Sequence, residues 1–414
     1  MKHTPRVVVF TTLFPRAGQP AAGLFIRERM FRVARFLPLT VVAPVPWFPF
    51  QALLRRWKPG FRPAALPFEV QQGIEVRSPR FLSVPGMFKW LDGVFMALGC
   101  LPTLLRLKRS FKFDLIDAHF AYPDGHAATL LGRWLGVPVT ITLRGTEVPI
   151  SGDPRRRSRL IKALGRASRI FAVSDSLKRL ARGLGVPNDK IMVIGNGVDI
   201  ATFHRVSRDE ARERLALRSD APVLISVGAL VERKGFHRVM ESLPILRERF
   251  PGLRYLVVGG ASPEGDWSAV LRQRAAELGV GNCVSFLGTL EPSELKIPLS
   301  AADVFVLATR NEGWANVFLE AMACGLPVVT TDVGGNAEVV CDSRLGLVVP
   351  FGHQKALTEA LAEALRRDWD RAAIAAHAAA NSWDRRVETL VQEFVVVAER
   401  DAAERSRGRP MNCA

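Results

Sequence analysis

The sequence predicts an α/β protein made of two doubly wound domains. Short apolar strands alternate with helices along the chain, and polar residues or glycines repeatedly follow the strands. This rhythm is typical of a mostly parallel sheet covered by helices, which binds ligands at the carboxyl ends of its strands. The rhythm restarts near residue 223, after the linker-like stretch 200–221, and 414 residues suit two domains of ordinary size.

The first half of the chain supplies the elements of an N-terminal domain. Helices are predicted at 24–36, at 125–135 and from residue 175 onward, each after a strand and a loop. We assign residues 1–205 to this domain, with the helix 385–404 as a candidate to complete it. The predicted strands are 6–11, 39–43, 114–118, 138–143, 169–173 and 191–194.

The second half repeats the alternation and forms the C-terminal domain, residues 206–384. Helices are predicted from 232–235, which open the first of them, to about 250 and from 316 to 323, and alanine-rich helices follow to about 403. The strands are predicted at 223–227, 255–258, 284–287, 302–308, 326–331 and 345–350.

The stretch 302–332 reads as strand, loop, helix and strand, and it contains two acidic residues that require a reason. Glu312 lies in the loop and Glu320 about one turn inside the helix. The start of a helix after a strand offers unpaired N–H groups and favours a phosphate. A nucleotide sugar would use both features, because its hydroxyls can donate to carboxylates. The alternative is that Glu312 is a solvated loop residue and Glu320 only adds charge to the helix.

The positive charge of the chain is confined to its first half. Residues 1–205 contain 32 Lys and Arg against 12 Asp and Glu, a net of +20, whereas residues 206–414 have a net of −3. A uniformly basic chain would suggest nucleic acid, but a one-sided charge suggests that one domain faces an anionic membrane or a polyphosphate. The stretches 46–58, 81–91 and 101–113 mix aromatic and basic residues, which favours a membrane surface over a merely solvated basic face.

The cysteines and the apolar runs predict the compartment. Five cysteines are scattered without metal-ligand spacing, so we expect no metal site, no disulfide framework and a reducing environment. No apolar run of about 18 residues is recognised in the sequence. We therefore expect a cytoplasmic protein, peripheral at the inner face of the plasma membrane.

The motifs of both halves together resemble those of a known enzyme family. They are Gly228, the Arg-Lys-Gly triplet 233–235, the Asn-Gly-Val-Asp run 196–199, the strand-end His119 and the stretch 312–329, EGWANVFLEAMACGLPVV. In this order, they are similar to the motifs of the retaining GT-B glycosyltransferases of family 4. The runs 118–125 and 143–147 most resemble the members that make bacterial envelope and secreted polysaccharides.

The resemblance implies a role for each matching residue. Arg233 and Lys234 would neutralise charge on the leaving diphosphate, as a metal ion does in other transferases, so no metal or other cofactor is expected. Glu320 would bind the ribose and Glu312 the donor hexose, and His119 would contact the transferred sugar. The implied catalytic residues are Glu312, His119, Arg233 and Lys234. The implied donor-binding residues are Gly23, Gly228, Arg233, Lys234, Glu312, Gly313, Trp314, Ala315, Asn316, Val317 and Glu320. The acceptor-side candidates are His119, Arg144 and Glu147.

The implied reaction moves a hexosyl unit from a nucleotide diphosphate sugar to a hydroxyl group, with retention at the anomeric carbon. The acceptor would be a glycan or a polyprenyl-diphosphate-linked saccharide, and no nucleic acid is expected. Two other functions stay open: a sugar-nucleotide epimerase or phosphorylase on the same scaffold, and a non-catalytic basic binding protein. The chain departs from the family pattern in the loop 258–263, at Trp314, where phenylalanine is commoner, and at Glu147, where aspartate is frequent.

Overall fold

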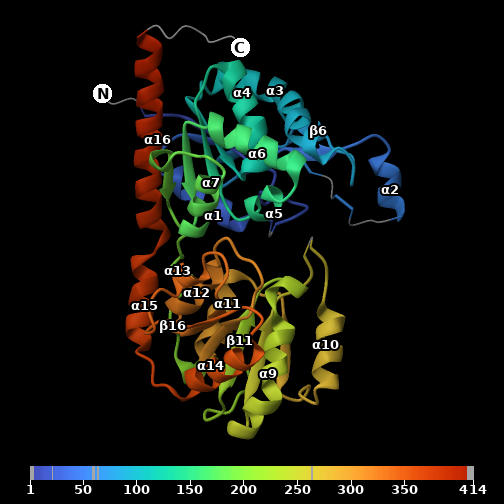
Figure 1. The fold of residues 1–414 in the computed structure, drawn as a ribbon, viewed down its shortest axis with the longest axis vertical. Helices are drawn as coiled ribbons and strands as arrows, with labels where there is room; N and C mark the ends of the chain where they lie inside the picture. Colours follow the sequence, from blue (N-terminus) through green and yellow to red (C-terminus); the bar gives the residue numbers. More distant parts are fainter. Residues whose placement is uncertain (1–3, 21, 58–60, 63–64, 263, 408–414) are drawn as a thin grey trace. The chain divides into compact units, whose positions relative to one another are not determined.

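The computed structural model describes residues 4–20, 22–57, 61–62, 65–262 and 264–407. The chain forms two compact units (Figure 1). Unit 1 contains residues 1–195 and 386–414, and unit 2 contains residues 196–385. The chain therefore passes from unit 1 to unit 2 after residue 195, ten residues before the boundary predicted from the sequence at residue 205. From residue 386 onward, the chain belongs to unit 1 again.

Unit 1 is built around an eight-stranded sheet in the order β10-β9-β8-β7-β1-β2-β5-β4. Its strands pair in parallel, except that β4 runs antiparallel to β5. The central strands β1, β7 and β8 are buried throughout, which explains why apolar residues predominate in them. The strands are β1 (Val7–Phe10), β2 (Leu39–Val42), β4 (Phe68–Gln71), β5 (Ile74–Arg77), β7 (Leu115–His119), β8 (Val139–Leu143), β9 (Arg169–Ala172) and β10 (Ile191–Val193); β3 (Val45–Trp47) pairs with β6 (Arg80–Leu82) in a second, small sheet.

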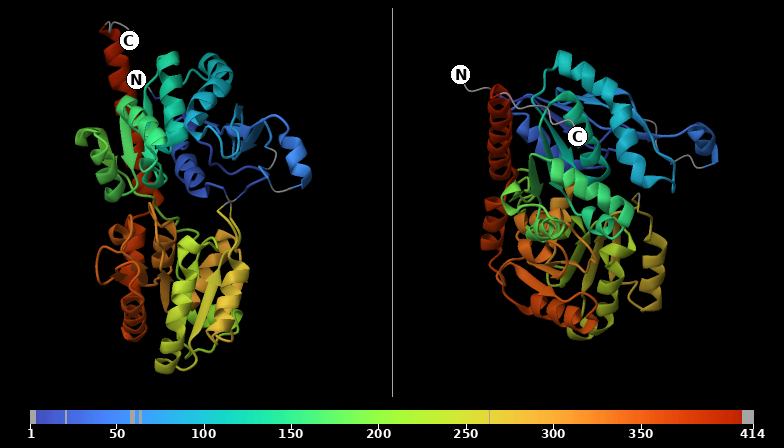
Figure 2. Two further views of the ribbon diagram at one scale, coloured as in Figure 1. Left: turned by 45° about the vertical axis from the view of Figure 1, so that its right-hand side comes forward. Right: turned by 45° about the horizontal axis from the view of Figure 1, so that its top comes forward.

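Helices cover the large sheet of unit 1, and the last helix of the chain is one of them (Figures 1 and 2). This helix, α16 (Trp383–Ser406), places Val387, Leu390 and Phe394 in the core beside residues of β1 and α1. The other helices are α1 (Leu24–Val33), α2 (Gln51–Trp57), η1 (Lys89–Leu91), α3 (Asp92–Ser110), η2 (Ala121–Gly125), α4 (His126–Leu135), α5 (Glu147–Ser151), α6 (Pro154–Arg166), α7 (Asp175–Gly183) and η3 (Asn188–Lys190).

One helical stretch in the described part of the chain, Lys89–Ser110, is long and apolar enough to cross a membrane by length and composition. The sequence reading overlooked it because Asp92, Pro102 and Arg106 interrupt the apolar run. Its main part, α3, packs against α4 and β6 and buries Met96 and Cys100. A core helix can pass the same test, so this finding is weak evidence for a membrane span.

Unit 2 has a six-stranded, fully parallel sheet in the order β13-β12-β11-β14-β15-β16. Numbered within the unit, this order is 3-2-1-4-5-6, the order of a Rossmann fold. The reversal lies between β11 and β14, and a comparable reversal between β1 and β7 occurs in unit 1. The predicted doubly wound α/β fold is thereby confirmed. The strands are β11 (Val223–Val227), β12 (Arg254–Val258), β13 (Val284–Gly288), β14 (Val304–Leu307), β15 (Val328–Thr331) and β16 (Gly346–Val349).

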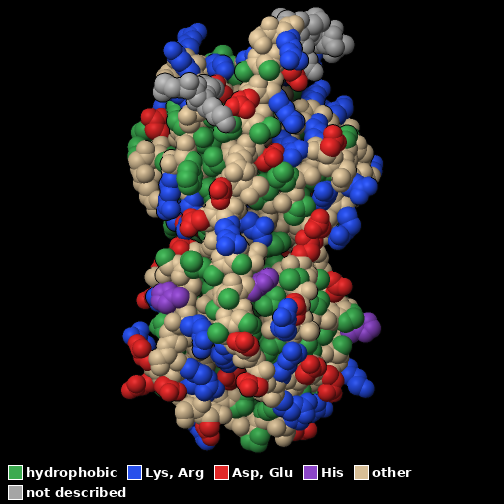
Figure 3. Space-filling model, turned by 90° about the vertical axis from the view of Figure 1, so that its left-hand side faces the viewer, with side chains coloured by type: hydrophobic (Ala, Val, Ile, Leu, Met, Phe, Trp, Pro, Cys, Tyr) green, Lys and Arg blue, Asp and Glu red, His purple; other side chains and the backbone are tan. Residues whose placement is uncertain are grey.

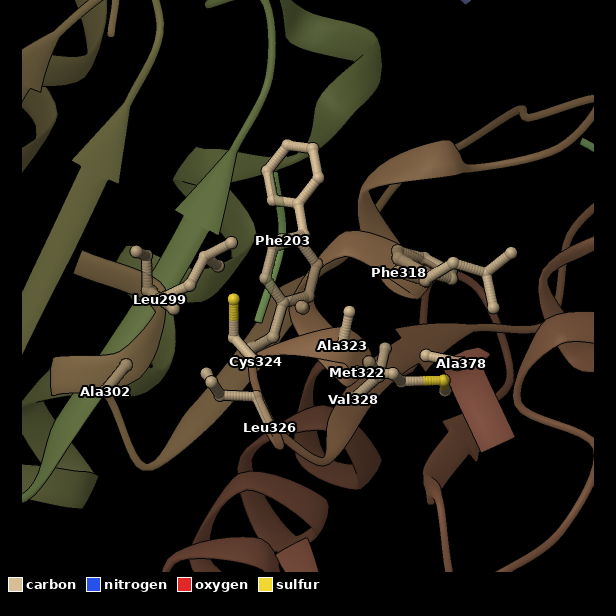
Figure 4. Packing of buried hydrophobic residues seen from close by; sticks show 14 of the residues in the cluster. Phe203, Leu299, Ala302, Phe318, Met322, Ala323, Cys324, Leu326, Val328 and Ala378 are labelled. Carbon is tan, nitrogen blue, oxygen red and sulfur yellow. The ribbon is translucent and has the colours of Figure 1, made fainter. Parts of the chain in front are cut away.

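Apolar helix faces fill the core of unit 2 on both sides of its sheet. Figure 4 shows Phe318 and Met322 of α12 within this core, together with Phe203 and Leu326. Burial of one face therefore fixes the position of α12. Its first turn is thereby held beside the edge of the sheet. The helices of unit 2 are α8 (Arg208–Arg214), η4 (Glu232–Lys234), α9 (Phe236–Arg249), α10 (Ser268–Glu277), α11 (Pro292–Ala301), α12 (Asn316–Ala323), α13 (Asn336–Val339), α14 (Gln354–Arg366) and α15 (Arg371–Ala380).

The surface of unit 2 reflects its nearly balanced charge. On the face drawn in Figure 3, its Lys and Arg side chains are interspersed with Asp and Glu. Unit 2 also has ion pairs at its surface, such as Arg249 with Glu359 at 3.0 Å. Such exposed pairs contribute little to stability, so the fold of unit 2 rests on its two apolar clusters.

Candidate functional site

The predicted donor-site residues of unit 2 gather where the strand order reverses. Gly228 follows β11, and Arg233 and Lys234 lie in η4 in the same connection. Glu312 lies in the loop after β14, which neighbours β11 in the sheet. Parallel neighbours end at the same edge, so residues 78 positions apart in sequence become neighbours in space. A reversal of this kind is where ligands bind in open α/β sheets.

The two cations of η4 form a cluster with the loop acid Glu312. Lys234 Nζ lies 2.6 Å and Arg233 Nη1 lies 3.2 Å from Glu312 Oε1. Thr309 Oγ1 donates to the same oxygen at 3.2 Å. The sequence-based grouping of Arg233, Lys234 and Glu312 is thus matched by direct contact. In this arrangement, the carboxylate of Glu312 compensates positive charge that a diphosphate could otherwise compensate.

Arg233 has a second acidic partner that the sequence reading missed. Its guanidinium donates to both carboxylate oxygens of Glu264, with Nη2–Oε1 at 2.7 Å and Nε–Oε2 at 2.9 Å. This fork raises the pKa of Arg233, and the same hydrogen bonds lower the pKa of Glu264. Glu264 directly follows the stretch 258–263, in which the chain departs from the family pattern, so no motif pointed to it.

The first turn of α12 provides backbone N–H groups beside this cluster. The helix begins after Ala315, and no side chain caps it. Asn316 Oδ1 accepts from Asn196 Nδ2 at 2.8 Å, which links this turn to the Asn-Gly-Val-Asp run. Trp314 is half-buried, and its Nε1 has no partner among the described residues. An uncapped helix start next to a cation cluster can bind a phosphate group.

Glu320 is the second acid of the pair predicted from the sequence. It lies on α12, is half-buried, and has no hydrogen-bond or ion-pair partner in the described part of the chain. Burial alone raises the pKa of Glu320 to about 7. An unpaired carboxylate at this position is available to accept hydrogen bonds from ligand hydroxyls.

We expect Glu320→Gln to stabilise the protein at pH 8 while weakening nucleotide binding. Because the folded pKa lies above the unfolded one, the folded state binds more protons between pH 4.5 and 7, and stability falls as pH rises through that window. Removing the charge should therefore add about 1–3 kcal/mol to the free energy of unfolding at pH 8. Loss of the carboxylate acceptor should weaken nucleoside diphosphate binding about tenfold.

Denaturant unfolding at pH 5 and pH 8 and calorimetric titration with UDP, GDP and ADP would measure both effects. Glu363→Gln, at an exposed position of α14, is the matched control and should change neither. A Glu320→Gln protein that is less stable at pH 8, or that binds nucleotide as tightly as the wild type, would contradict this role.

Three glycines allow close backbone contacts around the cluster. A Cβ at Gly334 would lie 1.6 Å from the carbonyl oxygen of Glu312, and one at Gly259 would lie 1.8 Å from that of Gly228. At Gly235, it would lie 1.9 Å from the Ala308 oxygen. All three residues have positive φ, so only glycine fits without strain. Gly334 was not predicted, although a Gly-Gly pair two residues after the end of a strand was a usable signal.

In unit 1, His119 is fully buried between a carboxylate and a guanidinium. Arg144 donates to His119 Nδ1, with Nε at 3.0 Å and Nη2 at 2.9 Å. Because a guanidinium can only donate, Nδ1 must accept and Nε2 carries the proton. Nε2 lies 3.3 Å from Asp117 Oδ2, in a geometry short of a hydrogen bond. Burial, together with the charge of Arg144, lowers the pKa of His119 to about 4, so the ring is neutral near pH 7.

Glu147 holds the loops around Arg144 in place. It is 1% exposed, and its carboxylate accepts from the backbone N–H groups of Ala121, Arg144 and Gly145 at 3.0, 3.2 and 2.8 Å. The guanidinium of Arg144 also packs over the ring of Phe25, 4.9 Å from its centroid. These contacts explain how the predicted acceptor-side residues are positioned. Their roles toward a sugar stay predictions.

Gly23 is required by its own loop. It precedes α1 with φ of 70°, and a Cβ there would lie 2.4 Å from the carbonyl oxygen of Leu13. The structure gives an internal reason for this glycine, namely the contact between the two ends of the β1–α1 loop. The predicted role of Gly23 in donor binding, through close approach to a diphosphate, stays a prediction.

Two family models match most of the chain. The model described as Glycosyltransferase Family 4 matches residues 61–202, and the model described as Glycosyl transferases group 1 matches residues 207–381. A D-inositol 3-phosphate glycosyltransferase of Actinosynnema mirum is 34% identical over 303 residues, which are 68% of this chain and 72% of that protein. TuaC of Bacillus subtilis, named as a teichuronic acid biosynthesis glycosyltransferase, is 29% identical over 87% of this chain and 88% of its own length.

Solved structures resemble the whole chain. Sucrose-phosphate synthase from Thermosynechococcus elongatus matches with a TM-score of 0.74 at 20% identity, over 95% of this chain and 98% of that one. Anabaena HepE in complex with UDP matches with a TM-score of 0.71 at 19% identity, over 94% of this chain and 99% of that one. At these identities, the likeness concerns the fold, which is that of GT-B glycosyltransferases with two Rossmann-like domains.

Proposed function

Since this chain belongs to the GT-B glycosyltransferases of family 4 and group 1, we propose that it transfers a hexosyl unit from a nucleotide diphosphate sugar to a glycan or lipid-linked saccharide. The observation that carries this proposal is the contact of Arg233 and Lys234 with Glu312 at the strand-order reversal. The match to TuaC supports an acceptor from bacterial surface or secreted polysaccharide synthesis.

The nucleotide sugar would bind to side chains that, in this structure, either pair with each other or have no partner among the described residues. A diphosphate would take hydrogen bonds from Arg233, Lys234 and the first turn of α12, and Glu312 would then be free to accept from a hexose hydroxyl. Glu320 would accept from the ribose. The HepE structures, which are complexes with UDP and with UDP-glucose, support a nucleotide sugar as the ligand.

The proposed reaction proceeds with retention of anomeric configuration. The bond between the anomeric carbon and the β-phosphate oxygen breaks, and the acceptor oxygen attacks from the same face of the sugar. The hydroxyl proton passes to the departing phosphate oxygen. Lys234 and Arg233 would stabilise the negative charge that grows on that phosphate, where preorganised charge has its largest effect on rate. We therefore propose that transfer proceeds without a metal ion and persists in EDTA.

Product analysis by mass spectrometry tests the proposal. Full-length protein is incubated with UDP-, GDP- and ADP-hexoses and a set of glycan and lipid-linked acceptors. We expect nucleoside diphosphate release only when an acceptor is present, and NMR spectroscopy of the product should show the same anomeric configuration as in the donor. Turnover without any acceptor would favour an epimerase, and turnover that needs inorganic phosphate would favour a phosphorylase. Salt-sensitive binding of nucleic acid without donor binding would favour the non-catalytic alternative.

We also propose that unit 1 contacts an anionic membrane surface at the inner face of the plasma membrane. The short helix α2 stands out from the rest of unit 1 (Figures 1 and 2). Phe50 and Trp57 at its ends are 83% and 82% exposed, and Arg55 and Arg56 lie between them. Aromatic and basic side chains together on an exposed segment suit a lipid interface.

Replacing both aromatic residues with serine should weaken binding of the full-length protein to vesicles that contain phosphatidylglycerol by about tenfold. Vesicle co-sedimentation measures this effect. The double variant Ile245→Ser and Val270→Ser removes two comparably apolar side chains that are 46% and 47% exposed in unit 2, and it should bind like the wild type. Equal losses in both variants would refute a specific role of α2.

A further inference from the structure

Unit 1 contains a cavity that none of the predicted site residues lines. Its volume is about 340 Å³, within the range of small-ligand pockets. It is lined by residues of the β1–α1 loop, of β3, of the end of β6 and of the beginning of α3, and by Arg62 and Ala65. Three cationic side chains and one acidic side chain line it: Arg16, Arg62, Lys89 and Asp92.

Arg16 is the least compensated of these charges. It is 9% exposed, and its Nη2 donates to the backbone oxygen of Thr12 at 2.7 Å. Its Nε is buried without a partner in the described part of the chain. No ion pair with a described carboxylate is formed, although Glu69 attracts it from a longer distance, and burial lowers the pKa of Arg16. A buried charge of this kind is costly unless a ligand or partner compensates it.

Lys89, Arg62 and Asp92 lie around the hydroxyl of Ser83. Lys89 Nζ is 2.9 Å from Ser83 Oγ and 3.2 Å from Asp92 Oδ2, while Arg62 Nη1 donates to the Ser83 carbonyl at 2.8 Å. Asp92 is 9% exposed, and burial raises its pKa in spite of the nearby Lys89. One carboxylate therefore opposes three cations, which leaves an excess of two positive charges around the cavity.

A purely structural role explains only part of this arrangement. Arg62 packs against the rings of Phe48 and Phe61, at 5.7 and 5.5 Å from their centroids, and so helps to hold its loop. Lys89 pairs with Asp92 at the start of α3. Neither contact explains why Arg16 is buried with an unused donor at the same cavity.

We propose that this cavity binds an oxyanion, a phosphate or a carboxylate, carried by the acceptor saccharide. The two excess cations provide the N–H donors that such a group requires, and guanidinium groups suit both anions. The hydroxyl of Ser83 already donates to Asp92 Oδ2 at 3.3 Å, so it holds the acid in place and does not count among these donors. The assignment of the ligand as the acceptor rests on the proposed transferase function. Anion binding itself can be measured without any transfer.

Isothermal titration calorimetry on the full-length protein at low ionic strength tests the site. The probes are glucose 6-phosphate, glucuronate and glucose. Since Lys234 could also attract anions, each titration is repeated in the Lys234→Ala background, where only binding at this cavity should persist. We expect Arg16→Gln, Arg62→Gln and Lys89→Gln each to weaken binding of the charged sugar about tenfold. Arg109→Gln, at an exposed position of α3, is the control and should have no effect.

Asp92→Asn provides a test of opposite sign. It removes the acid that opposes the cations, so the affinity for the charged sugar should rise several-fold, which a variant that only damages the fold would not produce. Preference for glucose 6-phosphate or for glucuronate decides between a phosphate and a carboxylate, and either supports the inference.

Equal affinity for glucose, or binding unchanged in Arg62→Gln and Asp92→Asn, would overturn the inference. UDP titrations of the same variants keep the two proposals separate. If anion binding depends on Arg62 but no donor is ever used, the cavity assignment holds and the transferase proposal fails. If transfer proceeds while binding ignores these residues, the cavity assignment fails alone.

Discussion

Lys234→Ala should lower the rate of hexosyl transfer by a factor of about 10²–10³ while leaving the fold intact. The ammonium group lies 2.6 Å from Glu312, and in the proposed reaction it would move its hydrogen bonds to the leaving diphosphate. Removal of one preorganised charge at a developing anion typically costs this much. The measurement is acceptor-dependent release of nucleoside diphosphate at saturating donor.

Lys355→Ala serves as the control for this variant. Lys355 is an exposed residue of α14 in the same unit, and its removal changes the net charge equally. Its transfer rate should equal that of the wild type. If Lys234→Ala retained more than a tenth of the wild-type rate, the proposed charge stabilisation by η4 would be wrong.

Gly334→Ala should lower both the stability of the protein and its transfer rate. The new Cβ would lie 1.6 Å from the carbonyl oxygen of Glu312, and the residue would have to keep a φ of 57°. The carbonyl oxygen is a backbone atom, and the position of a Cβ is fixed by the backbone. Neither atom can move away by a side-chain rotation, so the loop that carries Glu312 must shift. We expect a loss of about 2–4 kcal/mol in the free energy of unfolding, measured with denaturant.

Gly352→Ala separates the clash from the backbone conformation. Gly352 has a φ of 83°, but a Cβ there would meet no atom within 4 Å. It should therefore cost only the conformational strain, about 1 kcal/mol. Equal effects of the two substitutions on stability and on transfer would show that the Gly334 contact does not position Glu312.

The sequence allowed prediction of strands that are buried on both faces of a sheet. It also allowed prediction of the helix α12, which begins after the polar loop that follows β14. The strand expected at 302–308 is observed as β14, and the helix expected from Asn316 begins there as α12. A continuous apolar run and a helical spacing carry these signals locally. The antiparallel pair β4 and β5 was missed, although Gln72 and Gly73, both with positive φ, form the two-residue turn that joins it.

Contacts between segments that are distant in the sequence could not be predicted from it. Glu264 lies outside every recognised motif, yet it holds Arg233 through two hydrogen bonds. The pairing of His119 with Arg144 depends on the adjacency of β7 and β8, and the cavity around Arg16 and Lys89 depends on the packing of α3. The contacts of His119 with Arg144 and of Arg233 with Glu264 have no signature in local composition, because they join residues 25 and 31 positions apart.

The amino-acid sequence by itself determined the alternation of strands and helices, the one-sided distribution of charge, and the motif residues Arg233, Lys234, Glu312 and Glu320. Hydrophobic periodicity and residue chemistry are local properties, so they can be read along the chain. The tertiary structure alone decided which charges compensate one another. It paired Glu312 with both cations, left Glu320 and Arg16 without an ion pair to any acid that the structure describes, and buried His119. Strand order and packing set these distances, whereas sequence separation does not.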